Sequence, residues 1–208
     1  MAATVTPHVP LESGDRLTRA EFHRRYCARP DIKRAELVEG VVYVASPTRF
    51  GVHGKQHGAM TGLLFAYVAR TPGVQMANNA TVFLDTDNEL QPDVCLFRGV
   101  APPGGARVTE EGYIEGAPQL VVEIAASSAS YDMHDKLRAY RRAGVPEYVV
   151  WQVLEHEIIW FRLHEGEYVR VQPDARGVIE STTFPGLRLA MSAMLAGDFA
   201  AVLAALDD

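Results

Sequence analysis

Residues 120–126 read Leu-Val-Val-Glu-Ile-Ala-Ala, an apolar run that is interrupted at one position, by Glu123. A strand that is apolar on both faces is typical of the centre of a sheet that helices cover on both sides. A lone carboxylate in such a strand is costly to desolvate unless it is paired, protonated or bound to a cation. The run therefore predicts a central strand, and Glu123 predicts a compensating partner.

Two candidate partners for Glu123 stand elsewhere in the chain. Asp93 follows Pro92 at the start of an apolar strand, where neighbouring strands could bring it beside Glu123. Lys136 comes thirteen residues after Glu123, on the next expected helix, which could fold back over the end of that strand. Two carboxylates with a backbone carbonyl and waters suit Mg²⁺. Such a site would perform metal-assisted hydrolysis.

The remaining segments predict an α/β domain in which helices flank a mixed sheet. We expect a helix capped by Thr18, with Glu21 completing a capping box, and a strand hairpin at 35–45 around Glu39 and Gly40. Apolar spacing predicts further helices at about 57–69, 132–143 and 190–206. Strands are expected at 80–84, 93–97, 120–126, 148–153, 158–163 and 168–171. Residues 1–15 are expected to form a flexible arm and residues 16–208 a single domain.

Bulk properties restrict the class of protein. The 208 residues contain no apolar run long enough to span a bilayer and no signal peptide, so no membrane association is expected. Cys27 and Cys95 are far apart, which favours buried free thiols in the cytoplasm over a disulfide. The formal net charge of -6 argues against a protein that grips DNA by bulk charge alone, although a bound cation would offset part of it locally.

The order of short motifs resembles a known family. Pro92-Asp93 followed by Val122-Glu123-Ile124 is similar to the first part of the signature of PD-(D/E)xK nucleases, and the closer resemblance is to the Uma-type restriction endonucleases. The matching segments, which run from about residue 15 to 190, are Glu36-Leu37-Val38-Glu39-Gly40, Ser46-Pro47 before a His-led helix, the Asp93 strand, Val122 to Ser127, the helix residues Asp132, Lys136 and Tyr140, and Gly144 to Tyr148. Each motif is short; their shared order is the specific signal.

The resemblance implies a restriction-endonuclease-like fold and a Mg²⁺-dependent DNA endonuclease, with Mn²⁺ as an alternative ion. It assigns Asp93, Glu123 and the Ile124 carbonyl to the metal and Lys136 to the developing negative charge. Glu36 would bind a second ion or orient water. The implied substrate is DNA, and a homodimer follows by analogy with nucleases that cut both strands.

Two positions depart from the family pattern. Ala125 stands where the superfamily has its lysine, so Lys136 on the following helix is the candidate, with Asp132 one turn away on the same face. Gln152 stands where the family commonly has an acid, which leaves the outer part of the site open.

Other interpretations remain beside the nuclease. His53 and His57 could form a zinc pair, could begin a helix as polar residues, or could reach the phosphate or site water. Lys136 could make only an exposed ion pair with Asp132. The whole chain could be an inactive nuclease fold that binds nucleic acid or a partner protein, or it could hydrolyse another phosphoester. The acidic run at 85–89 predicts a turn, because it lacks the glycine and glutamate of a calcium loop.

Overall fold

The computed structural model describes residues 10–45, 51, 53–99, 105–126 and 131–207. Its larger sheet contains β3 (Val74–Asn78), β6 (Val94–Arg98), β9 (Leu120–Ala125), β10 (Glu147–Gln152), β11 (Glu157–His164) and β12 (Glu167–Arg170). The strand order is β12-β11-β10-β9-β6-β3, with β9 parallel to β10 and antiparallel to β6. The predicted central strand is confirmed, since β9 is interior and all six of its residues are buried.

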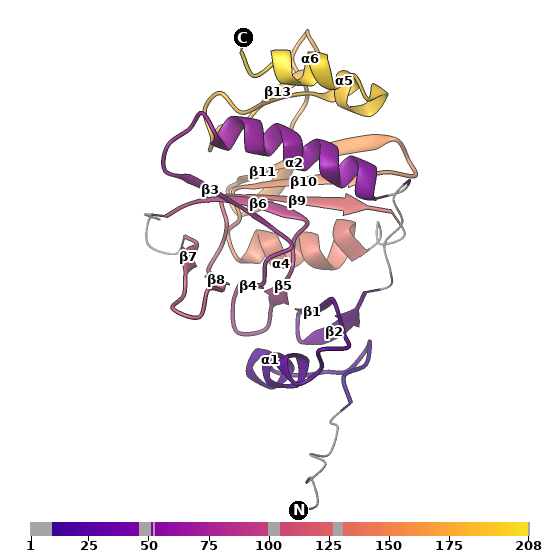
Figure 1. The fold of residues 1–208 in the computed structure, drawn as a ribbon, viewed down its shortest axis with the longest axis vertical. Coiled ribbons are helices and arrows are strands. Elements are labelled where there is room, and N and C mark those ends of the chain that lie inside the picture. Colours follow the sequence, from indigo (N-terminus) through magenta and orange to yellow (C-terminus); the bar gives the residue numbers. More distant parts are fainter. Residues whose placement is uncertain (1–9, 46–50, 52, 100–104, 127–130, 208) are drawn as a thin grey trace, which may run out of the picture.

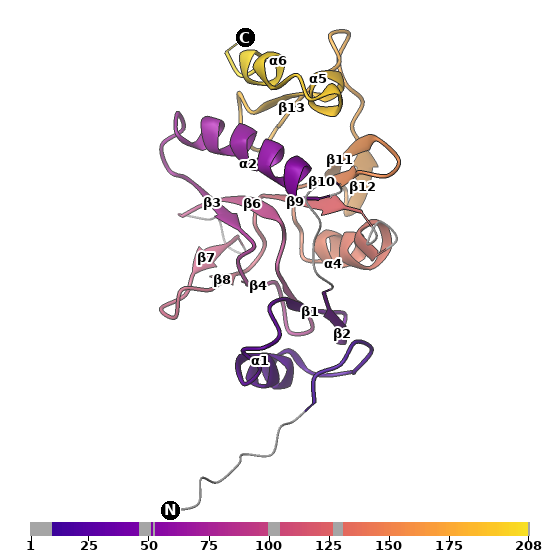
Figure 2. The same cartoon turned by 45° about the vertical axis from the view of Figure 1, so that its right-hand side comes forward.

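Helices cover both faces of this larger sheet (Figures 1 and 2). On one face α2 (Gly54–Val68) buries Met60, Leu63, Leu64 and Tyr67 against alternate residues of β6 and β9. On the other face a π-helical turn, η2 (Asp132–Lys136), continues into α4 (Leu137–Arg142). Both faces of β9 therefore lie in apolar cores, which accounts for its nearly continuous apolar sequence.

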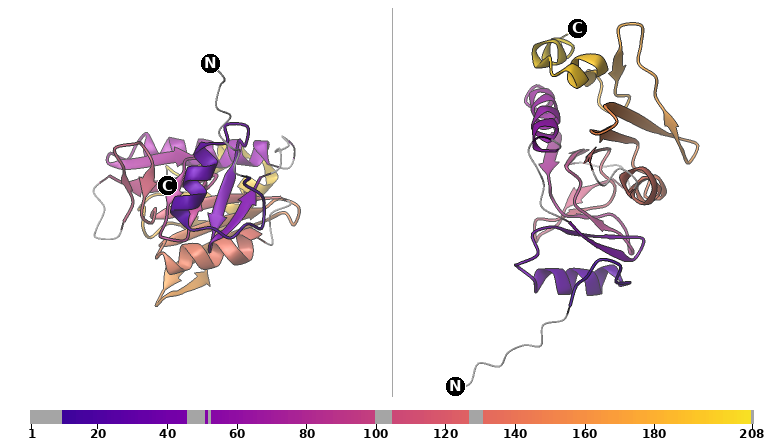
Figure 3. Two further views of the ribbon diagram at one scale, coloured as in Figure 1. Left: turned by 90° about the horizontal axis from the view of Figure 1, so that it is seen from below. Right: turned by 90° about the vertical axis from the view of Figure 1, so that its right-hand side faces the viewer.

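A second sheet lies on the α4 side of the first. Its strands are β1 (Ala35–Val38), β2 (Val41–Val44), β4 (Val82–Phe83), β5 (Glu89–Leu90), β7 (Arg107–Val108) and β8 (Ile114–Glu115), in the order β2-β1-β5-β4-β8-β7. The helix α1 (Arg19–Cys27) packs Phe22 against the outer face of this sheet (Figure 3). The second sheet thus separates α1 from the larger sheet.

Local signals in the first helix and the first hairpin are borne out in part. Thr18 caps α1 as predicted by accepting a hydrogen bond from the Glu21 amide, but Glu21 does not complete the capping box, because its two carboxylate oxygens bind Arg24 and Arg25 instead. Between β1 and β2, Glu39 and Gly40 have φ values of 50° and 76°. Two successive positive φ angles define the two-residue turn whose twist matches paired strands.

The C-terminal region differs from the prediction of one helix at 190–206. It forms two short helices, α5 (Met191–Ala196) and α6 (Phe199–Ala204), that lie beyond α2 from the larger sheet. Gly197 ends α5 in the left-handed conformation, and the Asp198 carboxylate then caps α6. The alanine-rich composition favoured one helix, but this pair of stop and start signals divides it.

The other differences between the predicted and the observed elements concern short strands. The sequence did not indicate β3, the short strands β7 and β8, or the hairpin of β13 (Val178–Glu180) and β14 (Arg188–Ala190). The predicted turn at 85–89 forms, although its last residue, Glu89, begins β5.

Near the N-terminus, Leu11 is buried and the Gly14 amide donates a hydrogen bond to the Val42 carbonyl at 2.8 Å. Among the described helices, none has both the length and the apolarity needed to cross a bilayer.

Candidate active site

Asp93 and Glu123 lie side by side on neighbouring strands. The antiparallel register of β6 and β9 sets Val94 opposite Val122, and one further step along it sets Asp93 opposite Glu123. Both residues are 2% exposed. The Glu123 carboxylate points to the face that α4 covers, because Tyr140 of α4 donates a hydrogen bond to it at 3.0 Å.

Asp93 is held as a carboxylate by three donors. Its Oδ1 accepts from Arg34 at 3.0 Å, and its Oδ2 accepts from the Ile124 amide at 2.8 Å and lies 3.2 Å from His53 Nε2. Burial opposes ionisation, but His53, Arg34 and the Ile124 amide outweigh it and hold the pKa of Asp93 well below its usual range. Asp93 is therefore charged at neutral pH.

Glu123 has the opposite electrostatic character. Complete burial raises its pKa to about 8, with nearby acids adding to the effect and Lys136 opposing it. Its Oε1 accepts hydrogen bonds from Lys136 Nζ at 2.9 Å and from the Tyr140 hydroxyl. A carboxyl group in this state needs additional positive charge before it is fully ionised.

Lys136 is the centre of the acidic cluster. Its ammonium lies 2.9 Å from Glu123 Oε1, 2.9 Å from Glu36 Oε2 and 3.5 Å from Asp132 Oδ1. Burial opposes the charge, but these acids raise the pKa of Lys136 above its usual value. The alternative of an exposed ion pair with Asp132 is wrong, because Lys136 is only 2% exposed.

The first strand and the π-helical turn bring Glu36 and Asp132 to this cluster. Glu36, on β1, also accepts a hydrogen bond from the Gln91 amide at 2.7 Å, which fixes its other oxygen on Lys136. Asp132 and Lys136 begin and end η2. The structure therefore brings together six residues that the sequence and the family resemblance singled out: Asp93, Glu123, Lys136, Glu36, Asp132 and Tyr140.

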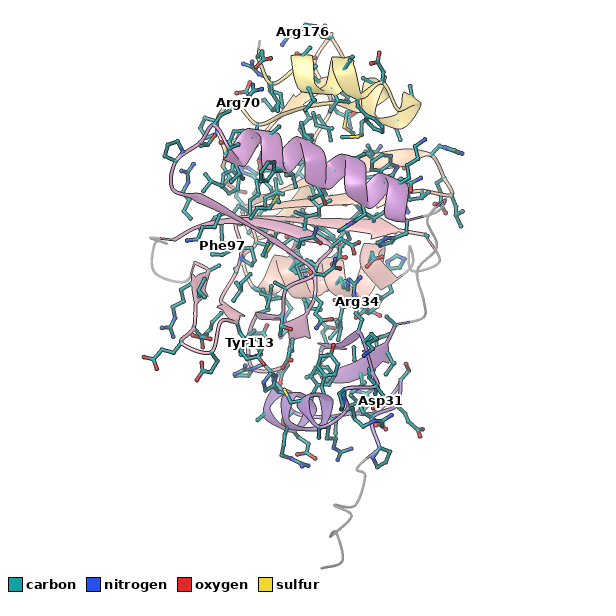
Figure 4. The ribbon with its side chains drawn as sticks, in the orientation of Figure 1. Asp31, Arg34, Arg70, Phe97, Tyr113 and Arg176 are labelled. Carbon is teal, nitrogen blue, oxygen red and sulfur yellow. The ribbon has the colours of Figure 1, made fainter. Side chains whose placement is uncertain are left out.

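Arg34 is the site residue that sequence reasoning missed. It directly precedes β1 and sends its guanidinium between the two sheets, where Nη1 binds Asp93 and Nη2 lies 4.0 Å from Glu123 Oε2 (Figure 4). Nη2 also donates to the Gln91 carbonyl. No motif marked this residue; its position two residues before Glu36, on the same side of the strand, was the available signal.

His53 and His57 lie on the Asp93 side of the cluster, where His53 precedes α2 and His57 lies in its first turns. Both reach Asp93: His53 Nε2 contacts Oδ2, and His57 Nε2 lies 3.2 Å from the main-chain oxygen. Their rings stack with centroids 5.7 Å apart. His53 is thus the histidine that contacts a site carboxylate, while the zinc interpretation gains no third ligand among the described residues.

The charges and donors of the cluster fit a divalent cation. Four buried acids, Glu36, Asp93, Glu123 and Asp132, face two permanent cations, Lys136 and Arg34. Burial is the largest cause of the raised pKa of Glu123, and the neighbouring acids add to it. Among the described residues no three His, Cys, Asp or Glu side chains form a ready metal cluster. Mg²⁺ commonly takes one or two carboxylates and completes its shell with water, so the pair Asp93 and Glu123 is compatible with it.

Other motif residues contribute less. Gln152 ends β10 at a half-buried position, so the outer acid of the family pattern has no counterpart there. Ser46, Pro47 and Ser127 lie outside the described residues. Arg138 and Arg142 both bind Glu39 on the surface of α4.

The fold and the paired strand carboxylates define the class of protein, a mixed α/β protein with a restriction-endonuclease-like fold. In agreement, the chain is similar to a crystal structure from Anabaena variabilis described as "a putative nuclease belonging to DUF820". The TM-score is 0.62 at 16% identity, over 83% of this chain and 96% of that one.

The family follows from the sequence match. The model of the Uma2 family, described as "Putative restriction endonuclease", matches residues 19–192, and the chain belongs to this family. Among curated proteins no match to the chain is found.

Proposed function

We propose that this protein is a metal-dependent endonuclease that hydrolyses phosphodiester bonds of DNA. The observation that carries the proposal is the convergence of Asp93, Glu123 and Lys136 at one strand end, in a chain of a nuclease family. Two adjacent carboxylates and one ammonium provide the metal ligands and the cation that phosphodiester hydrolysis requires.

Asp93 and Glu123 would hold the ion, together with the Ile124 carbonyl. Extending the strand register places Pro92 opposite Ile124, and proline has no N–H to offer that carbonyl. The N–H and C=O of one strand residue point to the same neighbouring strand, and the Ile124 N–H already points at Asp93. This arrangement supports the carbonyl as the third protein ligand.

Each remaining residue has a role that its contacts support. When bound, Mg²⁺ would polarise a phosphate oxygen and lower the pKa of the attacking water. Lys136, held between Glu123 and Glu36, would neutralise charge that develops on the phosphate. Tyr140 positions Glu123, and Glu36 would orient the water or contact a second ion.

Nicking of supercoiled plasmid DNA in Mg²⁺ or Mn²⁺ tests the proposal. We expect wild type to nick the plasmid and EDTA to abolish nicking. Asp93→Asn, Glu123→Gln and Lys136→Met should each reduce the rate at least about a hundredfold. Asp87→Asn, which changes an exposed turn acid, is the matched control and should keep full activity. Equal nicking by wild type and Asp93→Asn would identify a contaminating nuclease and reject the proposal.

A second candidate function is an inactive nuclease fold that binds nucleic acid or a partner protein. Ala125 at the usual lysine position, Gln152 and the net charge of -6 favour it. Fluorescence anisotropy on labelled duplex DNA, with Ca²⁺ in place of Mg²⁺, separates the two candidates. Binding without any nicking under Mg²⁺ or Mn²⁺ would support this second function. A homodimer, which double-strand cleavage would favour, is tested by light scattering on the purified protein.

A further inference from the structure

A second group of reactive side chains lies at α1, on the far side of the second sheet from the acidic cluster. His23 and Cys27 are one turn apart on α1, and Glu89 of β5 faces them from the sheet. His23 Nδ1 lies 2.9 Å from Glu89 Oε1, and His23 Nε2 lies 3.4 Å from Cys27 Sγ. A carboxylate, an imidazole and a thiol are therefore connected in a line.

Aromatic residues fix the orientation of the imidazole. The His23 ring packs edge-on against Phe83 and Tyr113, with centroids 5.0 and 5.1 Å away and interplanar angles of 89° and 88°. Figure 4 shows Tyr113 reaching toward α1 from the second sheet. With its ring held between two neighbours, His23 keeps one nitrogen on Glu89 and presents the other to Cys27.

The protonation pattern follows from these contacts. A carboxylate only accepts hydrogen bonds, so Glu89 selects the tautomer with a proton on Nδ1. Nε2 then carries a lone pair toward the Cys27 thiol, which is the arrangement of a nucleophile with its general base and an orienting acid. The Tyr113 hydroxyl lies beside the same sulfur and can donate to a developing thiolate.

Burial of the acid and exposure of the thiol complete the site. Glu89 is 1% exposed, and among the described residues its Oε2 has no hydrogen-bond partner. If the Glu89–His23 pair only anchored α1 to the sheet, no thiol would be needed beside His23 Nε2. Cys27 is exposed, contrary to the prediction of a buried thiol, so a reagent can reach its sulfur from solvent.

We propose that Cys27, with His23 as base and Glu89 as orienting acid, is a reactive thiol that undergoes exchange with small disulfides. His23 Nε2 takes the thiol proton while Sγ attacks one sulfur of the disulfide, whose S–S bond breaks. The imidazolium then returns the proton to the departing thiolate. One mixed disulfide on Cys27 and one free thiol result, so the disulfide is the only oxidant consumed.

Stopped-flow reaction with dithiodipyridine tests this proposal. Cys95 is fully buried, so the fast phase of the folded protein should belong to Cys27 and disappear in Cys27→Ala. We expect folded wild type to react at least about tenfold faster than the same protein in urea, measured against a free thiol in each solvent. If the folded protein and the unfolded chain react at the same rate, each relative to the free thiol in its own solvent, the proposal is overturned. This comparison needs no variant.

Two variants separate the relay from simple exposure. Glu89→Gln keeps an acceptor for His23 but removes the charge, and His23→Gln removes the base. Both should slow the reaction about tenfold and change its pH profile, to which Arg19 and Glu111 nearby also contribute. Unchanged rates in either variant, with thermal melting that confirms folding, would reject the relay. Oxidised glutathione should also modify Cys27, which mass spectrometry would detect. Wild type should be modified faster than Glu89→Gln and His23→Gln.

Discussion

Arg34 occupies a position that determines how the acidic site behaves without metal. Its guanidinium contacts Asp93 and lies near Glu123, so it neutralises the two carboxylates that the proposed function assigns to Mg²⁺. A fixed cation near both ligands repels an incoming ion. At 4 Å and an effective dielectric constant near 20, such a repulsion amounts to about 4 kcal/mol per unit charge before compensation.

We therefore expect Arg34→Met to bind Mn²⁺ about tenfold more tightly than wild type, while losing stability in the metal-free form. Isothermal calorimetry measures the first quantity and urea denaturation the second. Arg29→Met, which removes a cation that pairs with Asp31 outside the site, is the control. Weaker metal binding by Arg34→Met would show that Arg34 supports the site with metal bound.

Cys95 gives a prediction about alkaline stability. Burial of its thiol raises the pKa from 9.0 to about 12. The native state thus holds a proton that the unfolded state releases above pH 9, and stability must fall as pH rises from 9 toward 12. At pH 10 the loss is about 1.4 kcal/mol. Cys95→Ala should lack this component, which urea denaturation at pH 8 and pH 10 measures. Equal pH slopes in both proteins would contradict it.

At the level of elements, the turn between β1 and β2 has the clearest energetic signature. Gly40 has a φ of 76°, and a Cβ there would lie 3.4 Å from the Leu17 carbonyl oxygen. Gly40→Ala should therefore destabilise the protein by about 1 kcal/mol. Gly62→Ala makes the same change at an exposed position inside α2, with no atom within 4 Å, and should stabilise it by roughly 0.5–1 kcal/mol. Thermal melting of the two variants compares them, and shifts of the same sign would contradict this account.

Elements with strong local signals were predicted from the sequence. Glu39 and Gly40 predict the hairpin, and the run at 120–126, which is apolar on both faces, predicts β9 as a central strand. β4 lies within the strand predicted at 80–84. The two-residue strands β5, β7 and β8 carry no periodicity, so their pairing depends on the tertiary structure. The prediction of a single C-terminal helix is wrong because Gly197 ends α5 and Asp198 begins α6.

The candidate site was predictable where burial conflicts with charge. Glu123 in an apolar strand requires a compensating cation, and Lys136 lies 2.9 Å from its carboxylate. Asp93 adds a second acid beside it, which increases the need for positive charge. Arg34 and the Glu89–His23–Cys27 line were missed because they join residues 59 and 66 positions apart, across a topology that no local pattern encodes. These residues form no recognisable motif in the sequence, and their contacts exist only because the fold brings them together.

At the scale of the whole molecule, the acidic cluster depends on the docking of its layers. The larger sheet provides Asp93 and Glu123, the second sheet provides Glu36 with Arg34 at its edge, and the η2 turn provides Lys136. Each layer therefore brings charge that the others must compensate, and none of these groups could be buried without the rest. Occupation of the site by a cation should consequently stabilise the entire fold.

A ligand that binds only the native state raises the free energy of unfolding by RT ln(1 + [L]/Kd). At a Mg²⁺ concentration one hundred times Kd the gain is about 2.7 kcal/mol, which raises the melting temperature of a chain of this length by roughly 5–10 °C. Scanning calorimetry should detect this shift in wild type and in Asp87→Asn, at constant ionic strength. Asp93→Asn and Glu123→Gln should lose most of it, because each removes a ligand. An equal shift in all four proteins would assign the stabilisation to general ion effects and leave the two carboxylates without a role in metal binding.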